Sequence, residues 1–397
     1  MKPFVFPARL RVGPLRAGTF RSPLHDERTA AVLGLALGVA FTVCFATGVV
    51  SHLVQHPPSW FQWPSRPAGL YRWTQGLHIA TGIAAVPLLL VKLWVVYPRL
   101  FTWPPVEDAG HGLERLSLLA LVGGSLFMLA TGVMNIALWY PWGFYFPAAH
   151  YWGAWITIGG LVAHVGAKMT TARRALGPAG RPVVPLPPVE PRPDPGAGGL
   201  TRRGLLTTAL SAAGVLTVFT AGQTFRPLRG LAILAPRRPG TGPQGLPVNK
   251  TARSARVTES ARDPGWRLEI AGALRRPLSL SLDDLRGMPQ HEARLPIACV
   301  EGWSAEATWR GVRVRDLLAA AGAPDECEVE VRSLQERGRY KHSTLNRSHA
   351  GDGDTLLALE LNGEPLALDH GFPVRLIGPN RPGVLQTKWV GRLVVRA

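Results

Sequence analysis

Histidines at helical spacings are the first residues in this chain that could do chemistry. His150 and His164 lie 14 residues apart in a largely apolar stretch. On an α-helix this separation leaves both within roughly 40° of one face and about 21 Å apart along the axis. Neutral imidazole is a good metal ligand, and a histidine inside a membrane helix is a functional candidate. The spacing favours two haems stacked across a membrane; the alternative is that each histidine only hydrogen-bonds between helices.

Each haem needs a second histidine from another helix. His78 lies in a second apolar stretch, level with His150, and would complete the outer haem. His164 would pair at the inner side with His25, which lies just before the first apolar stretch. Three further histidines are rivals: His111 for the inner haem, and His52 and His56 for the outer haem.

Cys299 has the other distinctive setting. It lies in Leu295-Pro-Ile-Ala-Cys-Val-Glu-Gly-Trp-Ser304, a string followed by Trp309-Arg310-Gly311-Val312. In an oxidising compartment the simplest interpretation is a disulfide with Cys327. A soft thiolate can also bind a transition metal, so both possibilities stay open at this point.

Apolar stretches must position the histidines. Each approaches or meets the ~20 residues that a helix needs to cross a bilayer. Lys92 is the main internal charge, and it lies near a helix end from which its ammonium group can reach the interface. The first four stretches are roughly Ala30–Val50, Gly76–Tyr97, Leu116–Leu138 and Tyr151–Ala167.

Lysine and arginine in the connections orient these stretches. Fifteen lie in the N-terminal arm, the second loop and the segment that ends at Arg203, whereas the other two loops hold only Arg66 and Arg72. This imbalance places the N-terminus in the cytoplasm. Much of the formal charge of +18 therefore lies beside membrane helices, where it meets anionic lipid. We therefore exclude nucleic acid as a partner.

Adjacent arginines precede the fifth apolar stretch. Arg202 and Arg203 follow Thr201 and precede the uncharged segment Gly204–Gly222, which predicts an internal twin-arginine export signal. Such a signal is needed mainly when a cofactor is inserted in the cytoplasm before export. The C-terminal part would then cross the membrane already folded, with the twin-arginine translocation machinery as a partner. The alternative is a chance pair beside an ordinary membrane helix.

Composition divides the chain into five parts. Pro, Gly and Arg dominate two stretches that cannot form a packed core and predict linkers. The aromatic loop Trp139–Phe146 is typical of an interfacial belt, although a quinone pocket could also use it. The parts are a membrane domain (1–175), a cytoplasmic linker (176–200), the signal and fifth helix (201–223), an extracytoplasmic linker (224–246) and an exported domain (247–397).

Short β-type runs alternate with turns in the exported domain. A helical piece, Val314–Ala321, lies among them, and the pattern predicts an α+β fold. The runs are Trp266–Ile270, Glu328–Val331, Pro373–Ile377 and Trp389–Val395. The whole chain is thus predicted to be multi-domain, with an all-α transmembrane four-helix haem bundle, a fifth transmembrane helix and an α+β domain.

The arrangement of histidines resembles that of the di-haem cytochrome b subunits of membrane formate dehydrogenases and nickel–iron hydrogenases. The resemblance covers roughly residues 20–175. It implies two b haems, with His78 and His150 at the outer haem and His164 at the inner one. His25 lies several residues earlier than the family's first-helix ligand when Thr47-Gly48 is the anchor, which puts the second inner ligand in doubt.

The Cys299 string resembles the molybdenum-ligand segment of the sulfite oxidase family, in particular its methionine sulfoxide reductase branch. The resemblance covers about residues 247–397, including His-Gly-Phe-Pro-Val-Arg at 370–375 and Lys-Trp-Val at 388–390. It implies a molybdenum–pyranopterin (molybdopterin) cofactor with Cys299 as thiolate ligand and Asn249 close to the metal. It also implies that His370, Arg375 and Lys388 contact the pterin and its phosphate.

Two departures from this family matter. The segment after Cys299 lacks the arginines with which sulfite and nitrate enzymes hold oxyanions, which weakens a sulfite assignment. The chain also ends without the family's extra dimerisation domain, so a dimer of the sulfite oxidase type is not expected.

Together these features predict a multi-pass cell-membrane oxidoreductase with an extracytoplasmic molybdopterin domain. It would exchange electrons between quinone and an outside substrate through b haems, with sulfoxide reduction as the leading hypothesis. The alternatives are oxidation of a small substrate with quinone reduction, and a transmembrane electron carrier with a non-catalytic fused domain.

Overall fold

The structure is a computed structural model, and it describes residues 20, 22–101, 106, 108–177 and 200–396. Most of the N-terminal arm and of the linker predicted at 176–200 lies outside these residues. The described residues belong to two compact units. The first unit comprises Met1–Ala46 and His78–Val218, and the second comprises Thr47–Leu77 and Phe219–Ala397. Thus Thr47–Leu77, predicted as part of the membrane domain, groups with the C-terminal residues.

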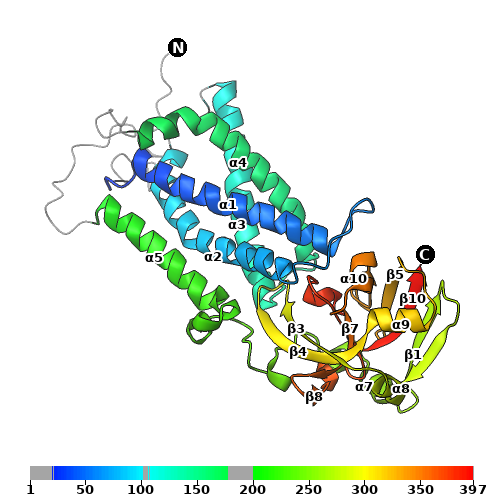
Figure 1. Cartoon of the computed structure of the whole chain (residues 1–397). Helices are drawn as coiled ribbons and strands as arrows, with labels where there is room; N and C mark the ends of the chain where they lie inside the picture. The colour runs from blue at the N-terminus through cyan, green and yellow to red at the C-terminus, as the bar shows by residue number, and fades with distance from the viewer. Residues whose placement is uncertain (1–19, 21, 102–105, 107, 178–199, 397) are drawn as a thin grey trace, which may run out of the picture. The chain divides into compact units, whose positions relative to one another are not determined.

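Long helices form where the apolar stretches were predicted (Figure 1). Among the residues that the structure describes, four helical segments are long and apolar enough to cross a membrane: Glu27–Gln55, Leu70–Arg99, Gly110–Ala137 and Arg202–Thr224. The helices are α1 (Glu27–Gln55), α2 (Leu70–Val96), α3 (Ala109–Ala137), α4 (Phe146–Leu176) and α5 (Arg202–Ala221). The short 3-10 helices η3 (Tyr97–Phe101), η4 (Gly222–Thr224), η5 (Arg226–Leu231) and η6 (Pro243–Gly245) follow α2 and α5.

Helix α4 differs from the prediction in composition. It is 31 residues long, but it is not among the four segments that are apolar enough to cross. Arg173 and Arg174 lie in its last turn, and Lys168 adds a third positive charge to the same half of the helix. These charges lie after the predicted crossing Tyr151–Ala167, which forms as part of a helix of sufficient length but is not among the four segments above.

Small residues allow the helices to approach one another closely. A Cβ atom added at Gly160 of α4 would lie 3.0 Å from the backbone nitrogen of Leu121 on α3. Lys92 of α2 donates a hydrogen bond to the carbonyl of Ala30 on α1, so its ammonium group binds a neighbouring helix rather than only reaching for the interface. Helix α5 buries Leu205, Ala209 and Ala213 in one cluster with Leu33 and Leu37 of α1 and Leu88 and Leu89 of α2.

The C-terminal domain contains two five-stranded sheets. The first has the order β2-β1-β10-β5-β6, in which β1 and β10 are parallel and the other pairs antiparallel. The second has the order β3-β4-β7-β8, with β9 also paired to β7. The strands are β1 (Arg267–Gly272), β2 (Leu278–Ser281), β3 (His291–Ala298), β4 (Ser304–Arg313), β5 (Glu328–Ser333), β6 (His342–Leu345), β7 (Leu356–Leu361), β8 (Glu364–Pro365), β9 (Arg375–Ile377) and β10 (Val390–Arg396).

Short helices join these strands, which confirms the predicted α+β class. They are α6 (Ala252–Ala255), α7 (Thr258–Arg262), α8 (Leu282–Gly287), α9 (Val314–Ala320) and α10 (Arg347–Gly351), with the 3-10 helices η7 (Leu368–His370) and η8 (Gly383–Leu385). Helix α8 begins at a capping box in which Ser281 and Asp284 satisfy each other's backbone N–H groups.

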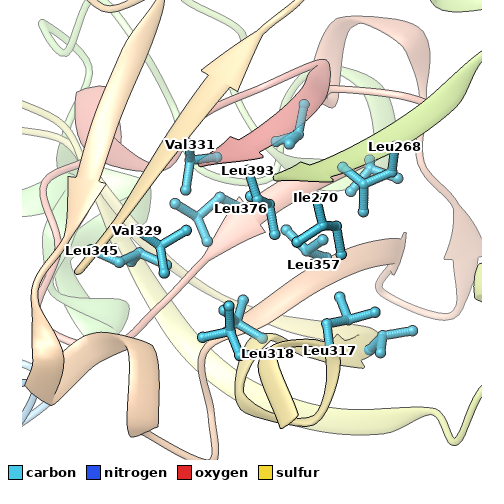
Figure 2. Close-up of a cluster of buried hydrophobic side chains, with 14 of the residues drawn as sticks. Leu268, Ile270, Leu317, Leu318, Val329, Val331, Leu345, Leu357, Leu376 and Leu393 are labelled. Carbon is cyan, nitrogen blue, oxygen red and sulfur yellow. The ribbon is translucent and has the colours of Figure 1, made fainter. Parts of the chain in front are cut away.

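The main core lies between the two sheets and α9. Leu268 and Ile270 of the first sheet, Leu357 of β7 and Leu317 of α9 belong to one buried cluster (Figure 2). Successive side chains of a strand point to opposite faces, so the alternate residues of β7, including Leu356, enter a second cluster together with Cys299. Strand β7 is thus buried on both faces, and it pairs with β4 of the hairpin that carries Cys299.

Candidate active site

A tight turn presents Cys299 at the end of a hairpin. Strand β3 ends at Ala298 and β4 begins at Ser304, so Cys299–Trp303 form the connection. The backbone N–H of Cys299 donates to the Trp303 carbonyl at 2.9 Å, and that of Gly302 donates to the Cys299 carbonyl at 3.1 Å. Gly302 has a φ of +92°, a conformation that disfavours any side chain. Backbone geometry therefore fixes the position of the thiol.

The Cys299 thiol is buried and hydrogen-bonded. Nδ2 of Asn249 donates to its Sγ at 2.9 Å, and Nε1 of Trp303 donates to Oδ1 of Asn249 at 3.3 Å. Burial, followed by the charge of Glu301, raises the pKa of Cys299 to about 12. At neutral pH the thiol therefore keeps its proton unless a cation compensates the thiolate. A bound metal ion does so, since a coordinating thiol is deprotonated.

Cys327 does not pair with Cys299. Both are free, and they lie in different hydrophobic clusters, so the disulfide interpretation is wrong. Cys327 packs in the core between the sheets. Its role there is that of a small apolar side chain.

His370 and Arg375 lie together behind the hairpin. Nε2 of His370 is 2.7 Å from the Pro243 carbonyl, and its buried Nδ1 lacks a protein partner. Burial, followed by the charge of Arg375, lowers the pKa of His370 to about 4, so the ring is neutral at pH 7. The neutral ring donates from Nε2, which leaves Nδ1 as an acceptor for an N–H group of a ligand.

Arg375 is 2% exposed and stacks over Trp309, with its guanidinium carbon 5.2 Å from the ring centre. It donates to the His370 carbonyl at 3.1 Å, but its buried Nε has no partner. Burial lowers its pKa to about 9, so it keeps its charge at pH 7.

Lys388 completes the cationic group. Its Nζ donates to the carbonyls of Asp369 at 2.7 Å and Lys250 at 3.1 Å. Burial first, and the charge of Arg375 second, lower its pKa to about 7; the charge of Cys299 acts in the opposite direction. The structure therefore brings Lys388, Arg375 and His370 to the side of Cys299 and Asn249, although these residues come from four separate segments of the sequence.

A second buried guanidinium lies on the loop between β9 and β10. Arg381 is 6% exposed and donates to the carbonyls of Thr344 and Leu385 at 3.0 and 2.8 Å. Burial lowers its pKa to about 10. Neither Arg381 nor Arg375 forms an ion pair with any carboxylate among the described residues. Buried charges without a counterion are costly, so these two cations favour an anionic ligand.

These features fit a molybdenum–pyranopterin group. The buried thiol is protonated and needs a cation before it can ionise, and the unpaired His370 Nδ1 can accept from an N–H group of a ligand. The two arginines without a counterion favour an acceptor-rich anion such as a phosphate. In the described part of the chain no three His, Cys, Asp or Glu side chains converge to hold a metal ion. A metal at Cys299 would therefore take its other ligands from a cofactor, as a dithiolene provides.

The residues next to Cys299 include some that we did not predict. Glu301 is 8% exposed, its Oε2 has no partner, and burial raises its pKa to about 7 although the charge of Arg237 lowers it. Gln75 and Thr224 donate hydrogen bonds to carbonyls of the same turn. Glu301 lies in the Cys299 string, two residues after the cysteine, but the string alone does not show that its carboxyl group is buried. The others depend on contacts between distant segments, which leave no local signal.

The helical unit brings His78 and His150 together. Their ring centres are 6.2 Å apart, at an angle of 76°. Nδ1 of His78 is 2.8 Å from the Cys44 carbonyl, and Nδ1 of His150 is 2.9 Å from Oγ1 of Thr131. Both Nδ1 atoms thus have polar partners on neighbouring residues, which leaves each Nε2 as the ring nitrogen that could bind a metal ion.

The inner pair is not brought together in the same way. Nδ1 of His25 lies 3.0 Å from the Val95 carbonyl, and its ring contacts Phe20 and Trp94. Nδ1 of His164 is buried without a partner. Within the described residues no ring contact or hydrogen bond joins His25 to His164.

The rival histidines have other contacts. His52 and His56 stack on each other with ring centres 4.7 Å apart. His111 accepts a hydrogen bond from Nε of Arg115 at 3.3 Å. The aromatic loop stacks Trp142, Phe144 and Phe146, and it leaves Trp142 54% exposed, which is typical of a side chain at an interface.

Comparisons with known proteins concern the C-terminal domain. Residues 255–397 match the family "Oxidoreductase molybdopterin binding domain". Human mitochondrial sulfite oxidase is 34% identical over 159 residues, which cover 33% of this chain and 29% of that protein. A barley nitrate reductase is 34% identical over 159 residues, covering 33% of this chain and 18% of the relative. The "Uncharacterized oxidoreductase YuiH" of Bacillus subtilis (strain 168) is 34% identical over 126 residues, covering 32% and 62%.

Among solved structures, the sulfane dehydrogenase SoxCD from Paracoccus pantotrophus matches with 25% identity and a TM-score of 0.31, over 33% of this chain and 38% of that one. The chain spans about a third of the length of the sulfite oxidases that it matches. The matched region contains the Cys299 hairpin and the cationic group. The C-terminal part of this chain is an oxidoreductase molybdopterin-binding domain of the sulfite oxidase family, homologous to sulfite oxidase and nitrate reductase.

Proposed function

We propose that this chain is a membrane-bound molybdenum oxidoreductase that carries electrons from quinol, through two b haems, to a sulfoxide outside the cell. The haem assignment depends on one observation, the distance between the rings of His78 and His150. At about 2.0 Å per metal–nitrogen bond, two imidazoles that share one metal ion have ring centres roughly 6 Å apart. The separation of 6.2 Å fits this arrangement.

The other ring nitrogens support the same interpretation. A metal-ligating histidine almost always donates its second N–H group to a carbonyl or another acceptor, which fixes the tautomer. The Cys44 carbonyl does this for His78, and the Thr131 hydroxyl takes the same place for His150.

His164 is the proposed ligand of an inner haem, with His25 as its proposed partner. His164 has a free, buried Nδ1, and His25 has its Nδ1 held by a backbone carbonyl. For this proposal α4 also crosses the membrane, packed against α3 through Gly124, Gly153 and Gly160. The N-terminus is then cytoplasmic, and α5 delivers the molybdopterin domain to the outside through the twin-arginine machinery.

The residues of the C-terminal domain have separate tasks in this function. Cys299 provides the thiolate for molybdenum, and Asn249 orients its sulfur. Arg375 and Lys388 bind the phosphate, and His370 accepts from an N–H group of the pterin. When bound, the molybdenum–pyranopterin group supplies two-electron chemistry, usually with transfer of an oxygen atom.

Glu301 supports a neutral substrate. Its carboxyl group lies two residues after Cys299 and is buried, and in its ionised form its negative charge disfavours a sulfite or nitrate ion nearby. A sulfoxide carries no net charge on its sulfur–oxygen group. Its reduction consumes two protons and two electrons and gives a thioether and water. Oxidation of one quinol supplies two electrons and releases two protons, so the two half-reactions balance.

A spectral and substrate survey tests this function. Membranes that contain the chain should show b-type haem bands after dithionite reduction. With a reduced viologen as electron donor, the purified protein should reduce methionine sulfoxide or a related sulfoxide faster than sulfite is oxidised with a ferricyanide acceptor. Absence of haem bands would contradict the electron route, and turnover of sulfite alone would contradict the substrate class.

A further inference from the structure

The turn that carries Cys299 is held by two side chains that come from the ends of long helices. Nε2 of Gln75, on α2, donates to the Val300 carbonyl at 2.9 Å. Oγ1 of Thr224, which follows α5, donates to the Gly302 carbonyl at 3.2 Å. Both bonds lie within the second structural unit, which contains Thr47–Leu77 and Phe219–Ala397.

The Gln75 amide has a fixed orientation. It is 6% exposed, and its Oε1 accepts from Oγ of Ser51 on α1 at 2.7 Å. Ser51 is in turn 3.4 Å from the hydroxyl of Tyr71, which is 1% exposed. Buried polar atoms are hydrogen-bonded because an unpaired one is costly. Since Ser51 donates to Oε1, the N–H₂ group of Gln75 faces Val300.

The end of α2 that contains Gln75 is itself held on the domain. The backbone N–H of Tyr71 donates to Oδ1 of Asn380 at 3.1 Å, and Nδ2 of Asn380 donates to the Pro64 carbonyl at 2.8 Å. Arg66 forms ion pairs with Asp352, at 3.1 Å, and with Asp354. The Gln75–Val300 bond is therefore part of a built interface and not an isolated contact.

Gln75 is also close in sequence to a proposed haem ligand. Helix α2 is continuous from Leu70 to Val96, so three residues separate Gln75 from His78, a rise of about 4.5 Å. We infer that Gln75 is a positioning residue for electron transfer, and that its hydrogen bond to Val300 is the link between α2 and the Cys299 ligand. This inference rests on the proposed function.

The route uses only bonds that the chain already contains. From Cys299 it passes along one peptide unit to the Val300 carbonyl and across the hydrogen bond to Gln75. When bound, the haems would supply electrons one at a time, and the molybdenum group would use two of them for each sulfoxide. No covalent bond forms or breaks at Gln75, and no proton is transferred there.

Thr224 supplies a matched control. It holds the same turn by a comparable hydrogen bond but follows α5, in which none of the proposed haem ligands lies. Gln75→Met removes the donor with little change in volume, and Thr224→Val does the same at the other anchor.

The test follows two rates in the purified full-length protein. In a stopped-flow experiment the haems are first reduced, methionine sulfoxide is added, and reoxidation of the haem band is recorded. Separately, steady-state sulfoxide reduction is driven by reduced methyl viologen, which serves the molybdenum directly. In Gln75→Met, haem reoxidation should slow by roughly tenfold, the order expected when one hydrogen bond is lost from an activated step. Its viologen activity and molybdenum content should stay within twofold of wild type.

Thr224→Val should keep the wild-type rate of haem reoxidation. An equal slowing in Gln75→Met and Thr224→Val would overturn the inference, because both variants then act only by loosening the turn. An unchanged rate in Gln75→Met would also overturn it. Failure of the proposed function looks different, since the wild-type haems would then not be reoxidised by any sulfoxide, and that result would remove both proposals.

Discussion

Asn249 donates a hydrogen bond to the sulfur of Cys299 across 2.9 Å, although 50 residues separate the two in sequence. The bond joins the segment that leads out of α5 to the hairpin of β3 and β4. Trp303, from the same hairpin, donates back to the Asn249 amide. This reciprocal contact places a polar amide beside a thiol, and the buried cations Arg375 and Lys388 come from β9 and from the segment just before β10.

The first prediction concerns the buried cation Arg375. Arg375→Met should lower the molybdenum content of the purified protein by tenfold or more, because the phosphate of the cofactor loses its buried guanidinium partner; a charge-assisted hydrogen bond contributes about 1.5–3 kcal/mol. Arg310→Met is the control, since Arg310 forms a partly exposed ion pair with Glu360 at 2.8 Å. Such surface pairs contribute little. Normal molybdenum in Arg375→Met, measured by mass spectrometry of the metal, would contradict the assignment.

A second prediction concerns haem ligation. His78→Ala and His150→Ala should each remove one and the same haem, since their ring centres lie 6.2 Å apart. His164→Ala should remove the other. Pyridine haemochrome analysis counts the haems, and redox potentiometry identifies which one is lost. Retention of both haems in His150→Ala or His164→Ala would contradict the stacked arrangement, and loss of both in His78→Ala alone would indicate misfolding.

The arginine pair before α5 gives a third prediction. Replacement of Arg202 and Arg203 by lysine preserves charge, so the orientation of the preceding helices should not change. A receptor that recognises the guanidinium groups should fail, because ammonium groups lack their planar donor geometry. The C-terminal domain should then stay in the cytoplasm, protected from protease added outside the cell.

Arg173 and Arg174 at the end of α4 provide the matched control for this experiment. Their replacement by lysine should leave export unaffected, because no apolar stretch follows them directly. If the Arg202/Arg203 double variant displays its C-terminus outside in normal amount, the pair is only a topogenic charge cluster.

The fourth prediction concerns pH. Burial, followed by the charge of Arg381, lowers the pKa of His349 from 6.5 to about 3. Its Nδ1 lies 2.7 Å from Oδ1 of Asn346, and its Nε2 is buried without a partner. The folded protein therefore keeps this ring neutral at pH values where the unfolded chain takes up a proton. Stability should be unaffected by this group above pH 6.5 and should fall as the pH drops from there towards 3.

At pH 4.5 this effect amounts to about 2–3 kcal/mol in the free energy of unfolding. His349→Gln removes the titrating group, so its melting temperature should fall less between pH 7 and pH 4.5 than that of the wild type. Thermal unfolding followed by tryptophan fluorescence measures both slopes. Identical slopes would show that His349 does not contribute to acid sensitivity.

Some of the fold could be predicted from local patterns. The runs at Glu328–Val331 and Trp389–Val395 became β5 and β10, and Val314–Ala321 became α9, because each has a clear period and turn residues beside it. Strand β7 was missed because burial on both faces gives it a continuous apolar run with no alternation. The β3–β4 hairpin was missed because its connection, Cys299–Trp303, lacks the usual turn residues apart from Gly302.

The candidate site could also be predicted only in part. Cys299, His370, Arg375 and Lys388 could be found because each lies in a characteristic string. Gln75 could not, because its contact with Val300 spans 225 residues and no local pattern marks it. The buried charge of Arg381 likewise becomes visible only in the folded domain, where it lacks an ion-pair partner among the described residues.

Reoxidation of reduced haem by a sulfoxide tests the central claim most directly. Purified wild-type protein, with its haems reduced by a limiting amount of dithionite, should lose its reduced haem bands when methionine sulfoxide is added, and the thioether should form at one molecule per two electrons. Cys299→Ser should keep normal haem bands but stay reduced, because the proposed thiolate ligand of the molybdenum is gone. Equal reoxidation in wild type and Cys299→Ser would contradict the account.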